Sequence, residues 1–118
     1  MMNRAAARPP TVLVVEDVEY IRSGLKRSAG GYGYLVLEAS DDEEAISVAQ
    51  EARPDLILTE EHLPTLAALL SRVREHPALC HLPVVIVNPD ADETTYYRDV
   101  VVLTAFDQLE SLLAPRQA

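Results

Sequence analysis

The chain has 118 residues, a net charge of −9 and a hydrophobic content of 48%. These values fit one globular domain with its own core, and no apolar run approaches the roughly 20 residues that a membrane span needs. The acidic balance and the absence of tryptophan argue against direct nucleic-acid binding, because phosphates would be repelled and aromatic stacking surface is scarce.

The ends of the chain and its single cysteine suggest how it is organised. The opening residues, MMNRAAARPP, lack the apolar centre of a signal peptide. We therefore expect a disordered tail over 1–10 and a single domain over 11–118. Cys80 is the only cysteine, which excludes an internal disulfide framework and is typical of a reducing cytoplasm, the location we expect.

Apolar runs and helical periodicities alternate along the chain. The helix predicted over 18–29 places Ile21, Leu25 and Ala29 on one inward face, and Ser40 with Glu43 has the form of a capping box. The β-α alternation predicts an α/β fold with a parallel sheet, right-handed crossovers and helices on both faces. Strands are predicted at 11–16, 34–39, 55–59, 82–87 and 99–105, with helices at 18–29, 40–52 and 64–76, at most a two-turn helix within 90–98, and a last helix from Asp107.

Carboxylates follow two of the predicted strands directly. Glu16 and Asp17 come after the strand residues 12–15, and Glu60 and Glu61 come after 56–59. Ligands of parallel α/β sheets bind beyond the carboxyl ends of the strands, so these acids should share one crevice, with Glu61 turned to solvent. Clustered acids repel one another, and a bound cation or an uptake of protons is the expected relief.

Several segments together resemble the response-regulator receiver domain of two-component signalling, over about residues 11–114. The resemblance implies a flavodoxin-like (CheY-like), doubly wound sheet of five parallel strands in the order 2-1-3-4-5, with a shortened fourth helix. It also implies a protein partner, either a histidine kinase or a downstream signalling protein, and a monomer or weak homodimer, without nucleic acid or membrane. The segments are VLVVED at 12–17, GYLVLEASDDEEAI at 33–46, PDLIL at 54–58 with LP at 63–64, LPVVIV at 82–87 and FDQLESLL at 106–113.

Active receivers accept a phosphoryl group on an aspartate with the help of Mg²⁺, and here the matching positions are partly changed. The acidic pair that helps hold the metal is Glu16 and Asp17, and the phosphoacceptor position is Glu60. The Ser/Thr position is Asn88, and the lysine position is Thr104. Two interpretations of the pair stay open: a Mg²⁺ site, or a remnant in which Asp17 caps the next helix. No other cofactor is implied.

These substitutions bear directly on phosphoryl transfer, which needs positive charge on the equatorial oxygens. Thr104 cannot supply the ammonium group of a lysine, and Glu60 extends its carboxylate about 1.5 Å further than aspartate would. A misplacement of about 1 Å can cost on the order of 100-fold in rate. We therefore expect a degenerate receiver that is not an enzyme and that signals through protein–protein interaction, independently of phosphorylation.

Two other functions are weighed against this one. A working receiver would accept a phosphoryl group with Mg²⁺ at the unusual acceptor. A flavin binder or enzyme on the same fold would need a phosphate-cradling loop after the first strand, where this chain has acids. The group His76, Cys80 and His81 matches no closed zinc pattern, so we interpret these residues as a loop.

Overall fold

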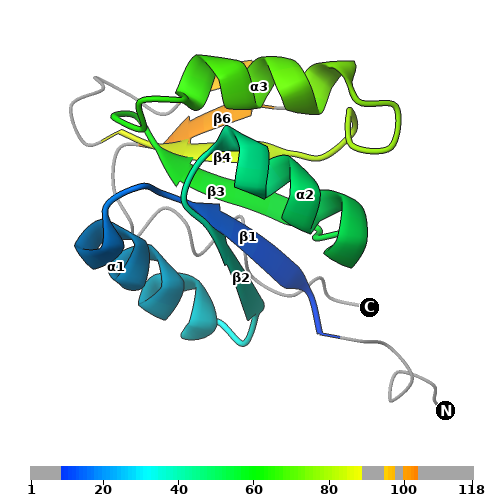
Figure 1. The fold of residues 1–118 in the computed structure, drawn as a ribbon. Helices are drawn as coiled ribbons and strands as arrows, with labels where there is room; N and C mark the ends of the chain where they lie inside the picture. Colours follow the sequence, from blue (N-terminus) through cyan, green and yellow to red (C-terminus); the bar gives the residue numbers. More distant parts are fainter. Residues whose placement is uncertain (1–8, 89–94, 98–99, 104–118) are drawn as a thin grey trace, which may run out of the picture.

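The computed structural model describes residues 9–88, 95–97 and 100–103, which form a six-stranded sheet of order β2-β1-β3-β4-β6-β5 with three helices (Figure 1). Of the tail predicted over 1–10, residues 1–8 lie outside the described residues, as do Thr104 and the helix expected from Asp107. The strands are β1 (Thr11–Val15), β2 (Leu35–Ala39), β3 (Leu56–Glu60), β4 (Val84–Val87), β5 (Thr95–Tyr97) and β6 (Val100–Leu103), and the helices are α1 (Glu19–Gly30), α2 (Asp42–Ala52) and α3 (Leu66–Glu75).

The predicted order of the parallel strands is confirmed. Strands β2, β1, β3, β4 and β6 pair in parallel in the order 2-1-3-4-5, counting β6 as the fifth. The helix expected within 90–98 is wrong for residues 95–97, which form β5 and pair antiparallel with β6, Tyr96 opposite Val101. The sequence Thr-Tyr-Tyr favours a strand, and pairing with β6 satisfies backbone groups that a short helix would leave open.

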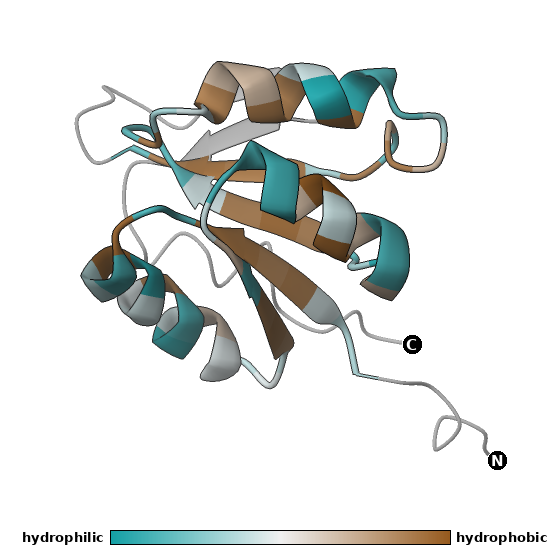
Figure 2. Cartoon of the chain, viewed as in Figure 1, coloured by the Kyte–Doolittle hydropathy of each residue, from teal (hydrophilic) through white to brown (hydrophobic). Residues whose placement is uncertain are grey.

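The three helices that the structure describes lie on both faces of the sheet. Helices α2 and α3 lie side by side on one face, and α1 lies on the other (Figure 1). Alternate residues of β1 divide between the faces, with Leu13 and Val15 towards α2 and α3, and Val12 and Val14 towards α1. Strands β1, β3 and β4 are therefore apolar on both faces, as Figure 2 shows by their hydrophobic colouring.

Two local predictions about the helices are corrected. In α1, Leu25 and Ala29 are buried as expected, but Ile21 is 37% exposed, because the first turn follows the end of β1 and has less sheet to cover. In α2 the N-cap is Asp41, whose Oδ1 accepts a hydrogen bond from the Glu44 N–H at 2.8 Å, and not Ser40. Glu44 in turn accepts from the Ser40 N–H at 2.7 Å, so the box lies one residue later than predicted.

Among the helices that the structure describes, none combines the length and apolarity that crossing a bilayer would take.

Candidate functional site: an acidic crevice at the carboxyl ends of the strands

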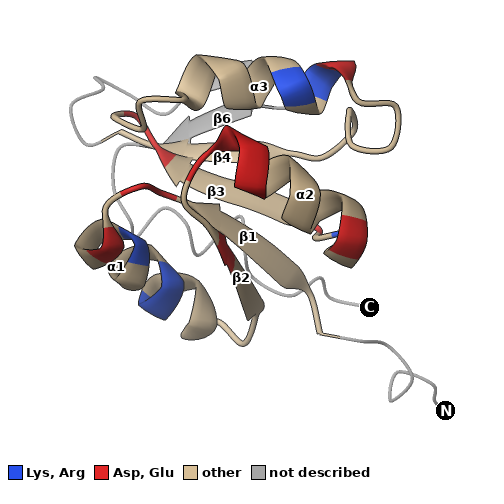
Figure 3. Ribbon diagram, in the orientation of Figure 1, with Lys and Arg blue, Asp and Glu red and all other residues tan. Residues whose placement is uncertain are grey.

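The carboxyl ends of β1 and β3 bring their acids to one edge of the sheet. The register places Val14 beside Leu58, so the residues that follow on each strand emerge together. The acidic colouring at both strand ends in Figure 3 lies at this edge. Strand β4 continues the edge, since Glu60 pairs with Val87 and the Glu61 N–H donates to the Val87 carbonyl at 3.0 Å.

Glu16 is a charged residue with no exposure at all. Its backbone continues the sheet, because its N–H donates to the Ala39 carbonyl at 3.0 Å. Its side-chain Oε2 accepts a hydrogen bond from the Val18 N–H at 3.0 Å. The second oxygen, Oε1, is buried and has no donor among the residues that the structure describes. Among the described residues, this oxygen gains a hydrogen-bond partner if the carboxyl carries a proton, which it can donate to a neighbouring acid.

The environment of Glu16 favours its neutral form. Burial raises the pKa of Glu16 from 4.5 to about 7, against the hydrogen bond from Val18, which lowers it. The carboxyls of Asp17 and Glu60 contribute smaller parts of the same rise in the pKa of Glu16, because a protonated Glu16 can donate to them and a negative charge on Glu60 repels a second one. The structure thus brings the three acids together, and uptake of a proton is the relief that this arrangement supports.

Glu60 is the last residue of β3 and is only partly exposed. Its Oε1 accepts a hydrogen bond from the His62 N–H at 3.1 Å, which ties the carboxylate back to its own loop. Glu61 is exposed, as expected. Asn88 follows β4 directly and is partly buried at the same edge of the sheet. Thr104 belongs to the predicted site but lies outside the described residues.

Asp17 does not cap α1. The N-cap residue is Val18, which makes no side-chain capping bond, and Asp17 is exposed. The capping role of Asp17 is therefore wrong, because the helix begins one residue later than that role requires. The Val18 N–H, which has no partner within the helix, donates instead to the side chain of the buried Glu16.

Two basic residues of α1, Arg22 and Lys26, lie beside the crevice and were not predicted from the sequence. Arg22 donates to the backbone carbonyl of Glu16 at 2.8 Å and to the Glu38 carboxylate at 3.3 Å. Lys26 contacts the same carboxylate at 3.1 Å, and these contacts, Lys26 first, lower the pKa of Glu38. Their spacing of four residues puts Arg22 and Lys26 on one face of α1, and this spacing could have predicted the basic pair from the sequence. Their charge is directed at Glu38 on β2 and not at the acids of the crevice.

A Mg²⁺ site in the crevice would require several oxygen ligands in near-octahedral geometry. Within the described part of the chain, no three His, Cys, Asp or Glu side chains are arranged to hold a metal ion. One oxygen of Glu16 and one of Glu60 already accept backbone N–H groups. As they lie, these side chains do not form a ligand set for Mg²⁺, and the metal role of Glu16 and Asp17 stays a prediction.

The doubly wound sheet with acids at its carboxyl edge defines the class of CheY-like signalling domains. A family model described as the response regulator receiver domain matches residues 12–115, and the chain belongs to that family. It is similar to chemotaxis response regulator CheY4 of Vibrio cholerae, with a TM-score of 0.64, 28% identity and 72% of each chain covered.

Two further similarities come from histidine kinases. The chain is 31% identical over 86 residues to the sensor histidine kinase TmoS of Ectopseudomonas mendocina, covering 71% of this chain but 9% of TmoS. The receiver domain of sensor histidine kinase PA1611 from Pseudomonas aeruginosa, solved with magnesium in its active-site cleft, shares the fold. That match has a TM-score of 0.74 at 19% identity, over 90% of this chain and 95% of the other.

Proposed function

We propose that this receiver domain signals without accepting a phosphoryl group and acts by binding a partner protein of a two-component or phosphorelay system. The observation that carries the proposal is Glu60. At the position where the family has its phosphoacceptor aspartate, the chain has a longer carboxylate that is tied to the His62 N–H at 3.1 Å. An acceptor held back by its own loop is poorly placed for in-line attack.

The charge around Glu60 supports the same conclusion. Phosphoryl transfer is catalysed mainly by positioning and by positive charge on the transferred group. Arg22 contacts the backbone of Glu16, but its guanidinium is already paired with Glu38. The sequence has threonine at position 104, where the family has its lysine, and threonine brings no charge.

The carboxylate of Glu60 could also keep the domain in a single signalling conformation. A glutamate at this position partly resembles a phosphorylated aspartate, because it carries negative charge further from the strand. The resemblance is weak, since a carboxylate has one charge and a phosphoryl group has nearly two. A domain held in this way would present a constant surface to its partner, without a kinase to switch it.

One candidate contact surface lies next to the crevice. Val18, Tyr20 and Ile21 at the start of α1 are 44%, 84% and 37% exposed. Exposed apolar side chains gathered at the start of a helix are candidates for contact with a partner protein. The partner we propose is a histidine kinase or a downstream signalling protein, as the family implies.

The proposal is tested by treating the protein with acetyl phosphate and Mg²⁺ and recording the intact mass. We expect no added phosphoryl group, and a receiver with a complete site serves as the positive control for the donor. A mass increase that maps to Glu60 would overturn the proposal and establish the alternative, a working receiver with an unusual acceptor.

A further inference from the structure

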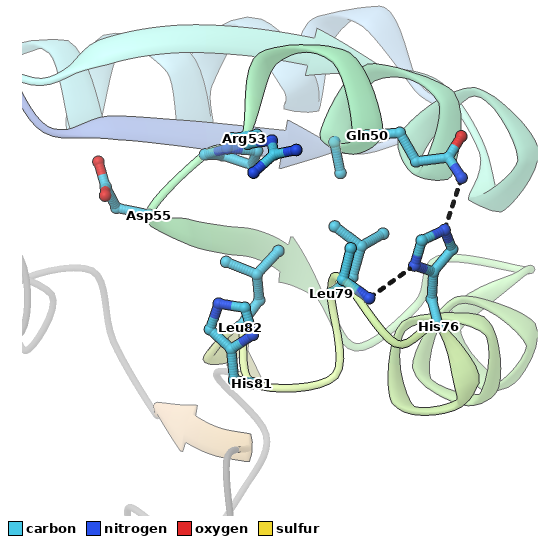
Figure 4. A pocket seen from close by; sticks show the side chains of 10 residues that line it. Gln50, Arg53, Asp55, His76, Leu79, His81 and Leu82 are labelled. Carbon is cyan, nitrogen blue, oxygen red and sulfur yellow. Dashed lines mark hydrogen bonds between the residues drawn. The ribbon is translucent and has the colours of Figure 1, made fainter.

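A second pocket lies at the opposite end of the sheet from the acidic crevice. Its volume is about 450 Å³, within the range of small-molecule sites. It is bounded by the end of α2, the start of β3 and the loop between α3 and β4 (Figure 4). Asp55 precedes β3, whereas Glu60 ends it, so the two sites are separated by the length of that strand. None of the receiver positions discussed above contributes to this pocket.

The pocket has an apolar floor and a polar rim. The floor includes Ala49, Leu79 and Leu82, which belong to the buried core cluster between the sheet and helices α2 and α3. An apolar floor of this kind favours a ligand with an apolar body. The rim is formed by the side chains of Gln50, Arg53, Asp55, His76 and His81.

Three of the rim residues, Asp55, His76 and Gln50, already contact other parts of the protein. Asp55 Oδ2 accepts a hydrogen bond from the Thr11 N–H at 2.7 Å. The ring of His76 is held at both nitrogens, because Nδ1 accepts from the Ala78 N–H at 3.1 Å and Nε2 contacts the Gln50 amide. The Gln50 atom that faces His76 Nε2 is the amide nitrogen (Figure 4). His76 is thus a fixed wall of the pocket.

The remaining rim groups, Arg53 and His81, are available. Arg53 follows α2 in the left-handed region at φ 52°, and its backbone N–H donates to the Ala49 carbonyl at 2.9 Å. Within the described part of the chain, the guanidinium of Arg53 and the ring of His81 form no hydrogen bond or ion pair. They approach the pocket from two sides, Arg53 from α2 and His81 from the loop before β4 (Figure 4).

We propose that this pocket binds a small organic anion, with its apolar or aromatic body on the floor and its carboxylate or phosphate at Arg53 and His81. The guanidinium fork matches both oxyanions, because it can donate two parallel hydrogen bonds to either. An anion is favoured over a cation because the pocket's carboxylate is already engaged, while its guanidinium is free to bind. The pocket shares no lining residue with the acidic crevice at the other end of the sheet.

The experiment titrates the full chain, labelled with ¹⁵N, with benzoate, phenyl phosphate and benzamide, the last as a neutral match for benzoate. We expect amide shifts confined mainly to residues 49–55 and 76–82, and binding of benzamide at least about tenfold weaker than benzoate, since a charge-assisted bond is lost. The preferred oxyanion is read from the ratio of the benzoate and phenyl phosphate affinities.

Variants distinguish binding in this pocket from nonspecific attraction of anions to other basic residues. Arg53→Asn keeps a residue that tolerates the left-handed backbone, and we expect it to weaken benzoate binding about tenfold or more. His81→Ala should also weaken it, whereas Arg27→Asn, on the other face of the sheet, should leave it unchanged. Equal binding of benzamide and benzoate, shifts that fall elsewhere, or no loss in either pocket variant would overturn the proposal, and His81→Ala decides should Arg53→Asn fail to fold.

Discussion

Glu16 and Glu60 lie beside each other at the ends of β1 and β3, one completely buried and the other partly exposed. Neither faces a basic side chain that would offset its charge within the described residues: Arg22, which touches the backbone of Glu16, is paired with Glu38. The buried position of Glu16 therefore favours its protonated form, and this links the stability of the fold to pH.

The first prediction concerns that dependence. Because the pKa of Glu16 is raised from 4.5 to about 7, the folded state binds a proton that the unfolded chain releases. The contribution is fully present below about pH 4.5 and is lost as pH rises through about 7, at a total of about 3 kcal/mol. Glu16→Gln should remove this loss, so the variant gains stability relative to the wild type between pH 5 and 8.

The measurement is urea unfolding of both proteins across that pH range. The difference between them isolates Glu16 from other titrating groups. Glu61→Gln, which changes an exposed acid one residue beyond Glu60, is the matched control and should track the wild type. A constant difference between Glu16→Gln and wild type at all pH values would show that Glu16 stays charged in the folded protein.

A second prediction addresses the lost chemistry. Glu60→Asp alone should give little phosphorylation by acetyl phosphate and Mg²⁺, because position 104 still lacks an ammonium group. The double variant with Thr104→Lys should be phosphorylated faster than the single variant by on the order of tenfold or more, since one preorganised charge is restored. Intact mass spectrometry over time gives both rates. If Glu60→Asp is already phosphorylated rapidly, the acceptor residue alone blocks the reaction.

The third prediction tests the position of the helix cap. Asp41→Ala should lower the free energy of unfolding by about 1 kcal/mol, because the Glu44 N–H loses its acceptor. Ser40→Ala removes a hydroxyl that donates to Glu44 at 2.9 Å, and we expect a smaller cost. Chemical denaturation of the two variants side by side measures this order. The reverse order would place the functional cap at Ser40.

A fourth prediction compares two residues of one helix. Leu25 is fully buried and Ile21 is 37% exposed, although both lie at the spacing of a single face. Leu25→Ala should destabilise the protein by about 2–5 kcal/mol, and Ile21→Ala by less than about 1 kcal/mol. Thermal and urea unfolding would show the contrast. Similar costs would mean that the first turn of α1 packs as tightly as its middle.

Much of the fold was predictable because its signals are local. Runs such as 12–15 and 56–58 are apolar on both faces, which requires a covered parallel sheet, and acids that directly follow such runs must reach its carboxyl edge. The N-cap of α2 was placed to within one residue. The cap was assigned to Ser40 instead of Asp41 because either residue has an acid three positions later, and backbone geometry decides between them.

Other features depended on contacts between distant segments. Residues 95–97 have a weak local preference, and it is pairing with β6 that makes them a strand. The sequence by itself determined that Glu16 and Glu60 would share an edge of the sheet, since apolar patterning sets the strand ends and the resemblance to receiver domains implies the strand order. Only the tertiary structure decided that Glu16 is completely buried and that Arg53 and His81 border one pocket, because burial and long-range proximity arise when the elements pack.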